Sequence, residues 1–173
     1  MLKRIKNIYG FTKLYLSNLF SLNILGMENI YNFLQISNTI ATSGQPTPEQ
    51  FQAIKEAGYQ VIINLALPES LNALKDEKQI VESQNMQYVH IPVVWEKPTM
   101  KNINDFFSIM EANNDKQVFV HCAANMRVSA FIYLYRCLHQ GIRDEDAKKD
   151  LHKIWIPNET WQRFIEQVIS MQK

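Results

Sequence analysis

From Ile36 onward, apolar runs of strand length alternate along the chain with longer segments of helical periodicity. The clearest run is 61–65, which opens with three β-branched residues in succession. A run of this kind is typical of a strand with both faces buried, and such strands occur in parallel sheets that helices cover on both sides. The pattern therefore predicts an α/β fold: a single three-layer domain with a mainly parallel central sheet flanked by helices.

The expected elements follow from this alternation. Strands are expected over 36–43, 61–65, 88–91 and 117–121, and helices over 48–58, 71–84, 102–112, 128–139, 144–153 and 158–171. Thr47, Pro48 and Gln50 form a capping box with proline at the first helical position, which marks where the first helix begins. Gly58 and Gly141 mark helix ends, because glycine readily adopts the left-handed conformation that closes a helix.

The length of the chain sets its domain organisation. With 173 residues, 46% of them hydrophobic, it is long enough for one core and leaves little room for a second. We expect one domain over 27–173, preceded by a basic and amphipathic extension over 1–26. The apolar stretch 14–25 is interrupted by serine and asparagine and is too short to span a bilayer, so no stable membrane insertion is expected.

Charge and cysteine content exclude several classes of function. Eighteen basic against seventeen acidic side chains offer no general attraction to nucleic acid. Cys122 and Cys137 would lie roughly 20 Å apart if a helix joins them, beyond disulfide reach, which favours a reducing, cytoplasmic location. No cluster of histidines and carboxylates has the spacing of metal ligands, so neither a metal nor another cofactor is expected.

One segment combines the residues that nucleophilic catalysis on an anion requires. It runs through His121, Cys122, Ala123, Ala124, Asn125, Met126 and Arg127, between a predicted strand and a densely apolar predicted helix. Loop amides and the helix dipole together form an anion site, and the same field stabilises a nucleophilic thiolate at Cys122. Arg127 adds a planar fork that matches two oxygens of a tetrahedral oxyanion and stabilises transition-state charge.

This segment resembles the His-Cys-loop-Arg signature of the protein tyrosine and dual-specificity phosphatase superfamily. A second stretch, 39–47 leading to 63–65, is similar to a bacterial phosphatase-like family related to domains fused to β-lactamase-like hydrolases. Together the two stretches cover about 36–139. The resemblance implies a fold of the phosphotyrosine phosphatase II type, and a phosphoric monoester hydrolase that uses a cysteinyl-phosphate intermediate.

The chain departs from the phosphatase pattern within the loop. Four residues separate Cys122 from Arg127, where the pattern has five, and the usual loop glycine is missing. Asn125 is its natural substitute, because asparagine tolerates left-handed backbone angles. Ser129 keeps the phosphatase spacing from Cys122, although Val128 now separates it from the arginine. The resemblance thus implies that residues 123–127 and Ser129 bind phosphate and that His121 supports the loop.

A phosphatase of this kind also needs an acid on a separate loop. Glu96 is the best match, because it follows a predicted strand in the loop 92–99, which can close over the pocket. Asp105 is the rival, and its place inside a predicted helix makes it less able to swing inward. The expected catalytic residues are therefore Cys122, Arg127 and Glu96.

Two alternatives remain open beside the phosphatase. The four-residue spacing is also that of rhodanese-type sulfurtransferases, which would carry a persulfide on Cys122 and need no general acid. The altered loop is also compatible with a non-catalytic phosphate-binding module. The sequence does not select a substrate: a phosphorylated protein, a nucleotide, a phosphoinositide and a small metabolite all fit the expected chemistry.

Overall fold

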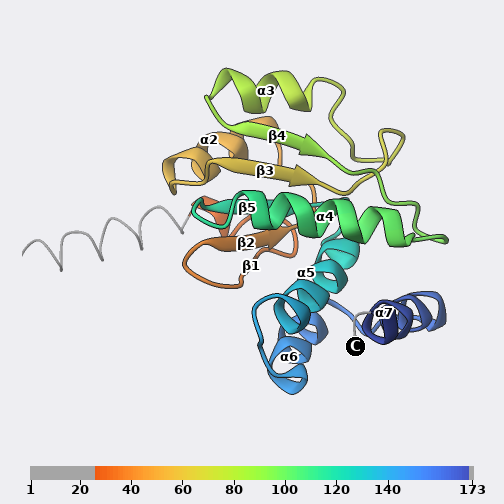
Figure 1. The fold of residues 1–173 in the computed structure, drawn as a ribbon. Coiled ribbons are helices and arrows are strands. Elements are labelled where there is room, and N and C mark those ends of the chain that lie inside the picture. Colours follow the sequence, from red (N-terminus) through yellow and green to blue (C-terminus); the bar gives the residue numbers. More distant parts are fainter. Residues whose placement is uncertain (1–25, 172–173) are drawn as a thin grey trace, which may run out of the picture.

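The computed structural model describes residues 26–171, which form a five-stranded sheet between two layers of helices (Figure 1). The strands are β1 (Leu34–Gln35), β2 (Ile40–Ser43), β3 (Val61–Asn64), β4 (Gln87–His90) and β5 (Val118–His121). Their order across the sheet is β1-β2-β5-β3-β4, and only the pairing of β1 with β2 is antiparallel. The prediction of a mainly parallel α/β sheet is confirmed.

The helices divide between the two faces of the sheet. They are α2 (Pro48–Glu56), α3 (Glu77–Ser83), α4 (Met100–Ala112), α5 (Met126–Leu138), α6 (Asp144–Ile154) and α7 (Glu159–Met171). Side chains of α4 to α7 share one core with the sheet, and α2 and α3 share the other. Figure 1 shows α4 running across one side of the sheet, with α5, α6 and α7 grouped beyond its β1 side.

Alternation of side chains along each strand produces these two cores. Val118 and Val120 belong to the core of α4 to α7, whereas Phe119 between them packs into the core of α2 and α3. In β3, Ile62 faces the side opposite to Val61 and Ile63 in the same way, and all four residues of the strand are buried. The sequence interpretation of a strand with two buried faces is therefore correct.

The capping box at Thr47 is present as predicted. The Thr47 side chain accepts a hydrogen bond from the amide of Gln50, and the Gln50 side chain accepts one from the amide of Thr47. Gly58 follows the helix with a φ of 98°, which only glycine adopts readily. The helix 48–58 thus begins where expected and ends two residues earlier, at Glu56.

Two predicted elements are wrong in part. The expected strand 36–43 begins only at Ile40, because the Ser37 hydroxyl accepts hydrogen bonds from the amides of Thr39 and Ile40 and closes a turn. The expected helix 71–84 begins only at Glu77, since successive turns occupy the segment before it. Leu71, where the helix was expected to begin, is fully exposed.

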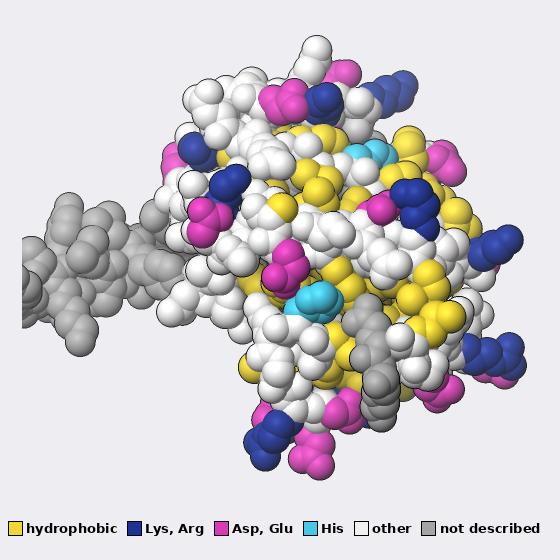
Figure 2. All heavy atoms as spheres, in the orientation of Figure 1, with side chains coloured by type: hydrophobic (Ala, Val, Ile, Leu, Met, Phe, Trp, Pro, Cys, Tyr) yellow, Lys and Arg dark blue, Asp and Glu magenta, His cyan; other side chains and the backbone are white. Residues whose placement is uncertain are grey.

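The charged surface and the ends of the chain complete the description. On the face drawn in Figure 2, basic and acidic side chains are interspersed. None of the helices within residues 26–171 is both long and apolar enough to cross a membrane. The predicted extension over 1–26 lies outside the described residues, apart from Gly26.

Candidate active site

The predicted loop lies where β5 ends and α5 begins, beside the ends of β2 and β3 (Figure 1). Cys122 is the first residue after β5 and is 1% exposed. Its amide donates to the carbonyl of Ser43, and Ala124 bridges to Gly44, so the loop crosses the end of β2. Carboxyl ends of parallel strands are where open α/β sheets bind ligands.

Asn125 gives the short loop its shape. Its φ is 65°, the left-handed conformation expected of the residue that replaces the loop glycine. The side-chain amide donates to the carbonyl of Asn32 at 2.7 Å and to the hydroxyl of Thr42 at 3.0 Å. The side chain is fully buried, so these two bonds fix the turn that leads into α5.

Side-chain donors hold the loop carbonyls from outside. Asn72 donates to the carbonyl of Ala123 at 2.9 Å, and Asn32 donates to that of Ala124 at 3.0 Å. The amide of Gln45 also reaches the carbonyl of Ala123, at 3.4 Å. Because a planar trans peptide directs its C=O and N–H to opposite sides, the amides that follow these carbonyls point away from the anchoring side chains.

Gly44 shows why the second resemblance stretch contains glycine at this position. A Cβ atom there would lie 2.8 Å from the Tyr31 ring, 3.0 Å from the Tyr31 carbonyl and 3.1 Å from the carbonyl of Ala123. Two of these neighbours are backbone atoms, which cannot move aside cheaply. The loop can approach the end of β2 this closely because residue 44 has no side chain.

The guanidinium of Arg127 lies against an aromatic cluster. Its Cζ is 5.8 Å from the ring centroid of Trp95, within the range of a cation–π interaction. Trp95 itself packs against Trp155 and Trp161, with ring centroids 5.1 and 5.3 Å away. Arg127 is 8% exposed, and its Nε has no hydrogen-bond partner among the described residues. The side chain is therefore held by stacking, and its donors remain available to an anion.

Trp155 and Trp161 also pack against each other, with ring centroids 6.1 Å apart. The indole of Trp161 also donates to the carbonyl of Trp95 at 3.0 Å, which fixes the loop that supports Arg127. Sequence patterns could not show this, because the contact joins residues 66 positions apart.

Ser129 lies one turn into α5 and is 5% exposed. Its hydroxyl donates to the carbonyl of Met126 at 2.9 Å and accepts a hydrogen bond from the indole of Trp155 at 3.0 Å. Trp155 also donates to the Met126 carbonyl, at 3.1 Å. In this arrangement Ser129 secures the end of the loop, and its contact with the phosphoryl group remains a prediction.

His121 forms a buried pair with Glu77, a residue that the sequence analysis did not single out. Nε2 of His121 lies 3.0 Å from the Glu77 carboxylate, which also accepts from Asn64 at 2.8 Å and from Gln45 at 2.5 Å. Burial alone would raise the pKa of Glu77, but the charge of His121 and hydrogen bonds with His121, Gln45 and Tyr88 outweigh it and hold the pKa below its usual value. The supporting role predicted for His121 therefore has a partner on α3.

The two candidate acids have different surroundings. Glu96 is exposed in the loop between β4 and α4, next to Trp95, and has no hydrogen bond or ion pair with a described residue. Asp105 lies inside α4 and pairs with Lys101 at 2.6 Å. The loop with Glu96 is thus attached to the site through Trp95, whereas Asp105 is engaged elsewhere.

The fold and the loop together define a phosphatase of the protein tyrosine phosphatase superfamily, and hence a hydrolase. More particularly, the chain belongs to the family described as "DSP-PTPase phosphatase fused to NAD+ Kinase", whose model matches residues 15–166. No group of three histidine, cysteine or acidic side chains able to hold a metal ion occurs within the described part of the chain.

Solved structures agree with this assignment. A DUF442 protein from Shewanella putrefaciens CN-32 is 34% identical, with a TM-score of 0.78 over 86% of this chain and 98% of that one. Tk-PTP in its active form (13% identity, TM-score 0.69, 80% and 97% covered) and P. aeruginosa TpbA (14%, 0.65, 82% and 89%) share the fold. No curated protein sequence matches the chain.

Proposed function

We propose that the protein hydrolyses a phosphoester through a cysteinyl-phosphate on Cys122. The observation that supports this best is the position of Arg127, whose guanidinium is held by Trp95 at the end of the loop that starts with the cysteine. A thiol and a planar cation on one short loop, at the start of a helix, suit attack on a tetrahedral dianion. The hydrogen bonds that anchor the loop support the proposal, because such a reaction depends on a fixed geometry.

The proposed reaction has two steps. The thiolate of Cys122 attacks phosphorus, the bond from phosphorus to the leaving oxygen breaks, and Glu96 protonates that oxygen. Water then attacks the phosphorus of the intermediate, its proton passes to Glu96, and the S–P bond breaks to restore the thiolate. Arg127 and the amides of 123–127 hold the phosphoryl oxygens, and Ser129 supports the thiolate or the departing group.

The substrate is proposed to be a phosphorylated protein or a phosphorylated small molecule. Structures with this fold include a cysteine-to-serine variant of TpbA in complex with phosphotyrosine, and the catalytic domain of SIW14 from S. cerevisiae, described as a PP-IP phosphatase. The fold therefore accommodates both classes. A reducing, cytoplasmic setting forms part of the proposal, because the thiolate must stay unoxidised.

The four-residue loop favours one competing function, sulfur transfer, and a direct assay separates the two. A phosphoester and thiosulfate are offered to the same preparation, and each rate is compared with that of the Cys122→Ser variant. We expect turnover of the phosphoester that the variant lacks. Activity on thiosulfate alone would identify a sulfurtransferase, and phosphate binding without turnover of either compound would identify a non-catalytic binding module.

A further inference from the structure

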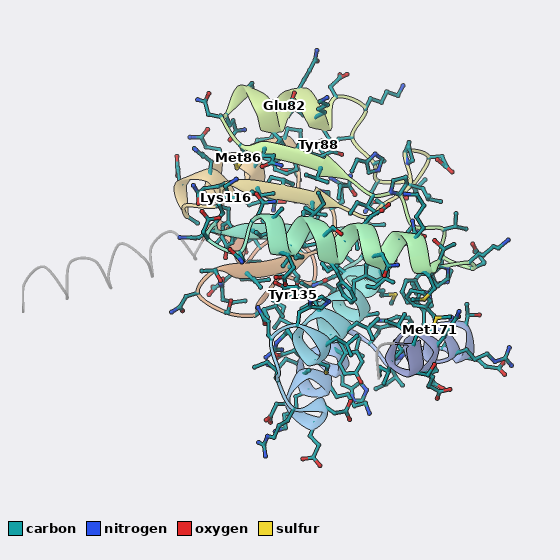
Figure 3. All side chains as sticks on the ribbon, in the orientation of Figure 1. Glu82, Met86, Tyr88, Lys116, Tyr135 and Met171 are labelled. Atoms are coloured by element: carbon teal, nitrogen blue, oxygen red, sulfur yellow. The ribbon has the colours of Figure 1, made fainter. Side chains whose placement is uncertain are left out.

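A cavity of about 530 Å³ lies between α3 and the carboxyl ends of β3 and β4. Figure 3 labels Tyr88, one of its lining residues, on the strand beside α3. No residue of the catalytic loop lines this cavity. Its volume is within the range of small-molecule sites, about 300–1,000 Å³, and the carboxyl edge of a parallel sheet is where such sites form.

Two basic side chains of the cavity, Lys75 and Lys78, offer contacts to an anion. Both line the cavity, as does His90, whose Nε2 lies 2.8 Å from the carbonyl of Ala66. Within residues 26–171 no carboxylate pairs with Lys75, and Lys78 has only an exposed contact with Glu82 at 3.9 Å. Both ammonium groups are exposed and can therefore bind an anionic group that enters the cavity.

Glu77 is the acid among the described residues that line the cavity, and its carboxylate is held by partners within the protein. Glu77 is 3% exposed, and its carboxylate already accepts hydrogen bonds from Asn64 and Gln45 beside its contact with His121. Its charge is nevertheless felt at the cavity wall, where it contributes to raising the pKa of Tyr88. Glu77 both lines the cavity and contacts His121, the residue before Cys122.

The remaining wall of the cavity is apolar, so a ligand that fits it also needs an apolar part. Leu67, Pro68 and Leu74 line the cavity together with the ring of Tyr88. The Tyr88 hydroxyl is occupied by a hydrogen bond from Asn64 at 3.2 Å, which leaves the body of the ring as contact surface. A phosphate ion alone would leave this wall uncovered, whereas a ring or short chain attached to the anionic group would cover it.

We propose that this cavity is a second ligand site, separate from the catalytic loop, for a small organic anion that combines a phosphate or carboxylate group with an apolar body. Lys75 and Lys78 bind the anionic group, and Leu67, Leu74 and Tyr88 contact the body. The proposal does not depend on the phosphatase mechanism, because none of its contacts involves the Cys122 loop.

The test uses phenylphosphonate, which carries both required groups and cannot be hydrolysed as an ester. It is titrated into the full chain with Cys122→Ser and Arg127→Ala, so that the catalytic loop does not compete, and amide resonances are followed by NMR. We expect saturable shifts at Lys75, Lys78, Tyr88 and His90. Methylphosphonate, without the ring, and benzyl alcohol, without the charge, should each bind more weakly.

A matched pair of variants in the same background checks the role of the lysines. Lys75→Ala with Lys78→Ala should weaken binding about tenfold or more, because two charge-assisted contacts are lost. Lys149→Ala with Lys153→Ala removes the same charge from exposed positions of α6 and should leave binding unchanged. Equal loss in both pairs, no saturable shift, or shifts confined to 122–127 would overturn the proposal.

Discussion

The backbone of the loop that starts at Cys122 and the side chain of Arg127 are held by different kinds of interaction. Hydrogen bonds from Asn32, Asn72 and Asn125 fix the backbone of the loop, and Glu77 fixes His121. Arg127, in contrast, lies against the ring of Trp95, and its Nε has no hydrogen-bond partner among the described residues. Directional hydrogen bonds fix the shape of the loop, whereas the contact with Trp95 positions Arg127 without using its hydrogen-bond donors. A hydrogen-bonded arginine would have fewer donors left for an anion, and aromatic contacts would not fix the backbone of the loop.

The largest effect on activity is expected when the guanidinium of Arg127 is lost. Arg127→Lys keeps the charge but removes the planar fork and its stacking on Trp95, so we expect kcat/KM to fall by about a hundredfold or more. Arg136→Lys, at the far end of α5 and paired with Asp150, is the control and should keep nearly full activity. A fully active Arg127→Lys enzyme would mean that the arginine is structural.

The loop that contains Trp95 also carries the proposed acid, Glu96. Glu96→Gln should slow hydrolysis of an alkyl phosphate by about a hundredfold and should barely affect an ester whose leaving group is strongly acidic, because that oxygen departs unprotonated. Asp105→Asn should leave both substrates unchanged, since Asp105 pairs with Lys101. Equal slowing of both esters by Glu96→Gln would exclude it as the acid.

The contact between Glu77 and His121 is tested through the stability of the protein. Glu77→Gln leaves buried donors imperfectly paired, and we expect a loss of about 2 kcal/mol in the free energy of unfolding at neutral pH. Glu82→Gln, exposed on the same helix, should cost far less. A neutral effect of Glu77→Gln would show that the His121 contact is not needed for the fold.

The same variant predicts a pH dependence. Since the pKa of Glu77 is lowered in the folded state, its contribution to stability is present above the usual carboxyl value of 4.5 and is lost as the pH falls through the lowered pKa. Wild-type protein should therefore lose more stability than Glu77→Gln on acidification below that value. Denaturant unfolding at a series of pH values measures the difference.

The smallest effect is expected for the aromatic support alone. Trp95→Leu removes the ring under Arg127, and an interaction of this kind corresponds to about a tenfold change in kcat/KM or less. Trp95→Phe should lose less, because a weaker ring remains. Val94→Ala changes the exposed neighbour and serves as the control. If Trp95→Leu kept full activity, stacking would not be what positions the arginine.

The sequence predicted the parts of the site that are local in the chain. The strand, the loop, the helix and the left-handed Asn125 all follow from patterns within about twenty residues. Glu77 was missed because its contact with His121 spans 44 residues and nothing near Glu77 marks it as buried. Asn32 was missed for the same reason, at 92 residues from Ala124. The expected helix over 71–84 also concealed that Asn72 lies in a turn that reaches the loop.

The anchoring of the loop by distant segments has a consequence for folding. The loop between Cys122 and Arg127 is tied to residues 32, 42, 45 and 72, and His121 just before it is tied to residue 77. The geometry of the loop therefore exists only after most of the chain has come together. Contacts of such long sequence separation form late and slowly, because the chain entropy of the intervening segments must be lost first. Recovery of activity during refolding should therefore coincide with the final cooperative transition, which makes turnover itself a sensitive reporter of complete folding.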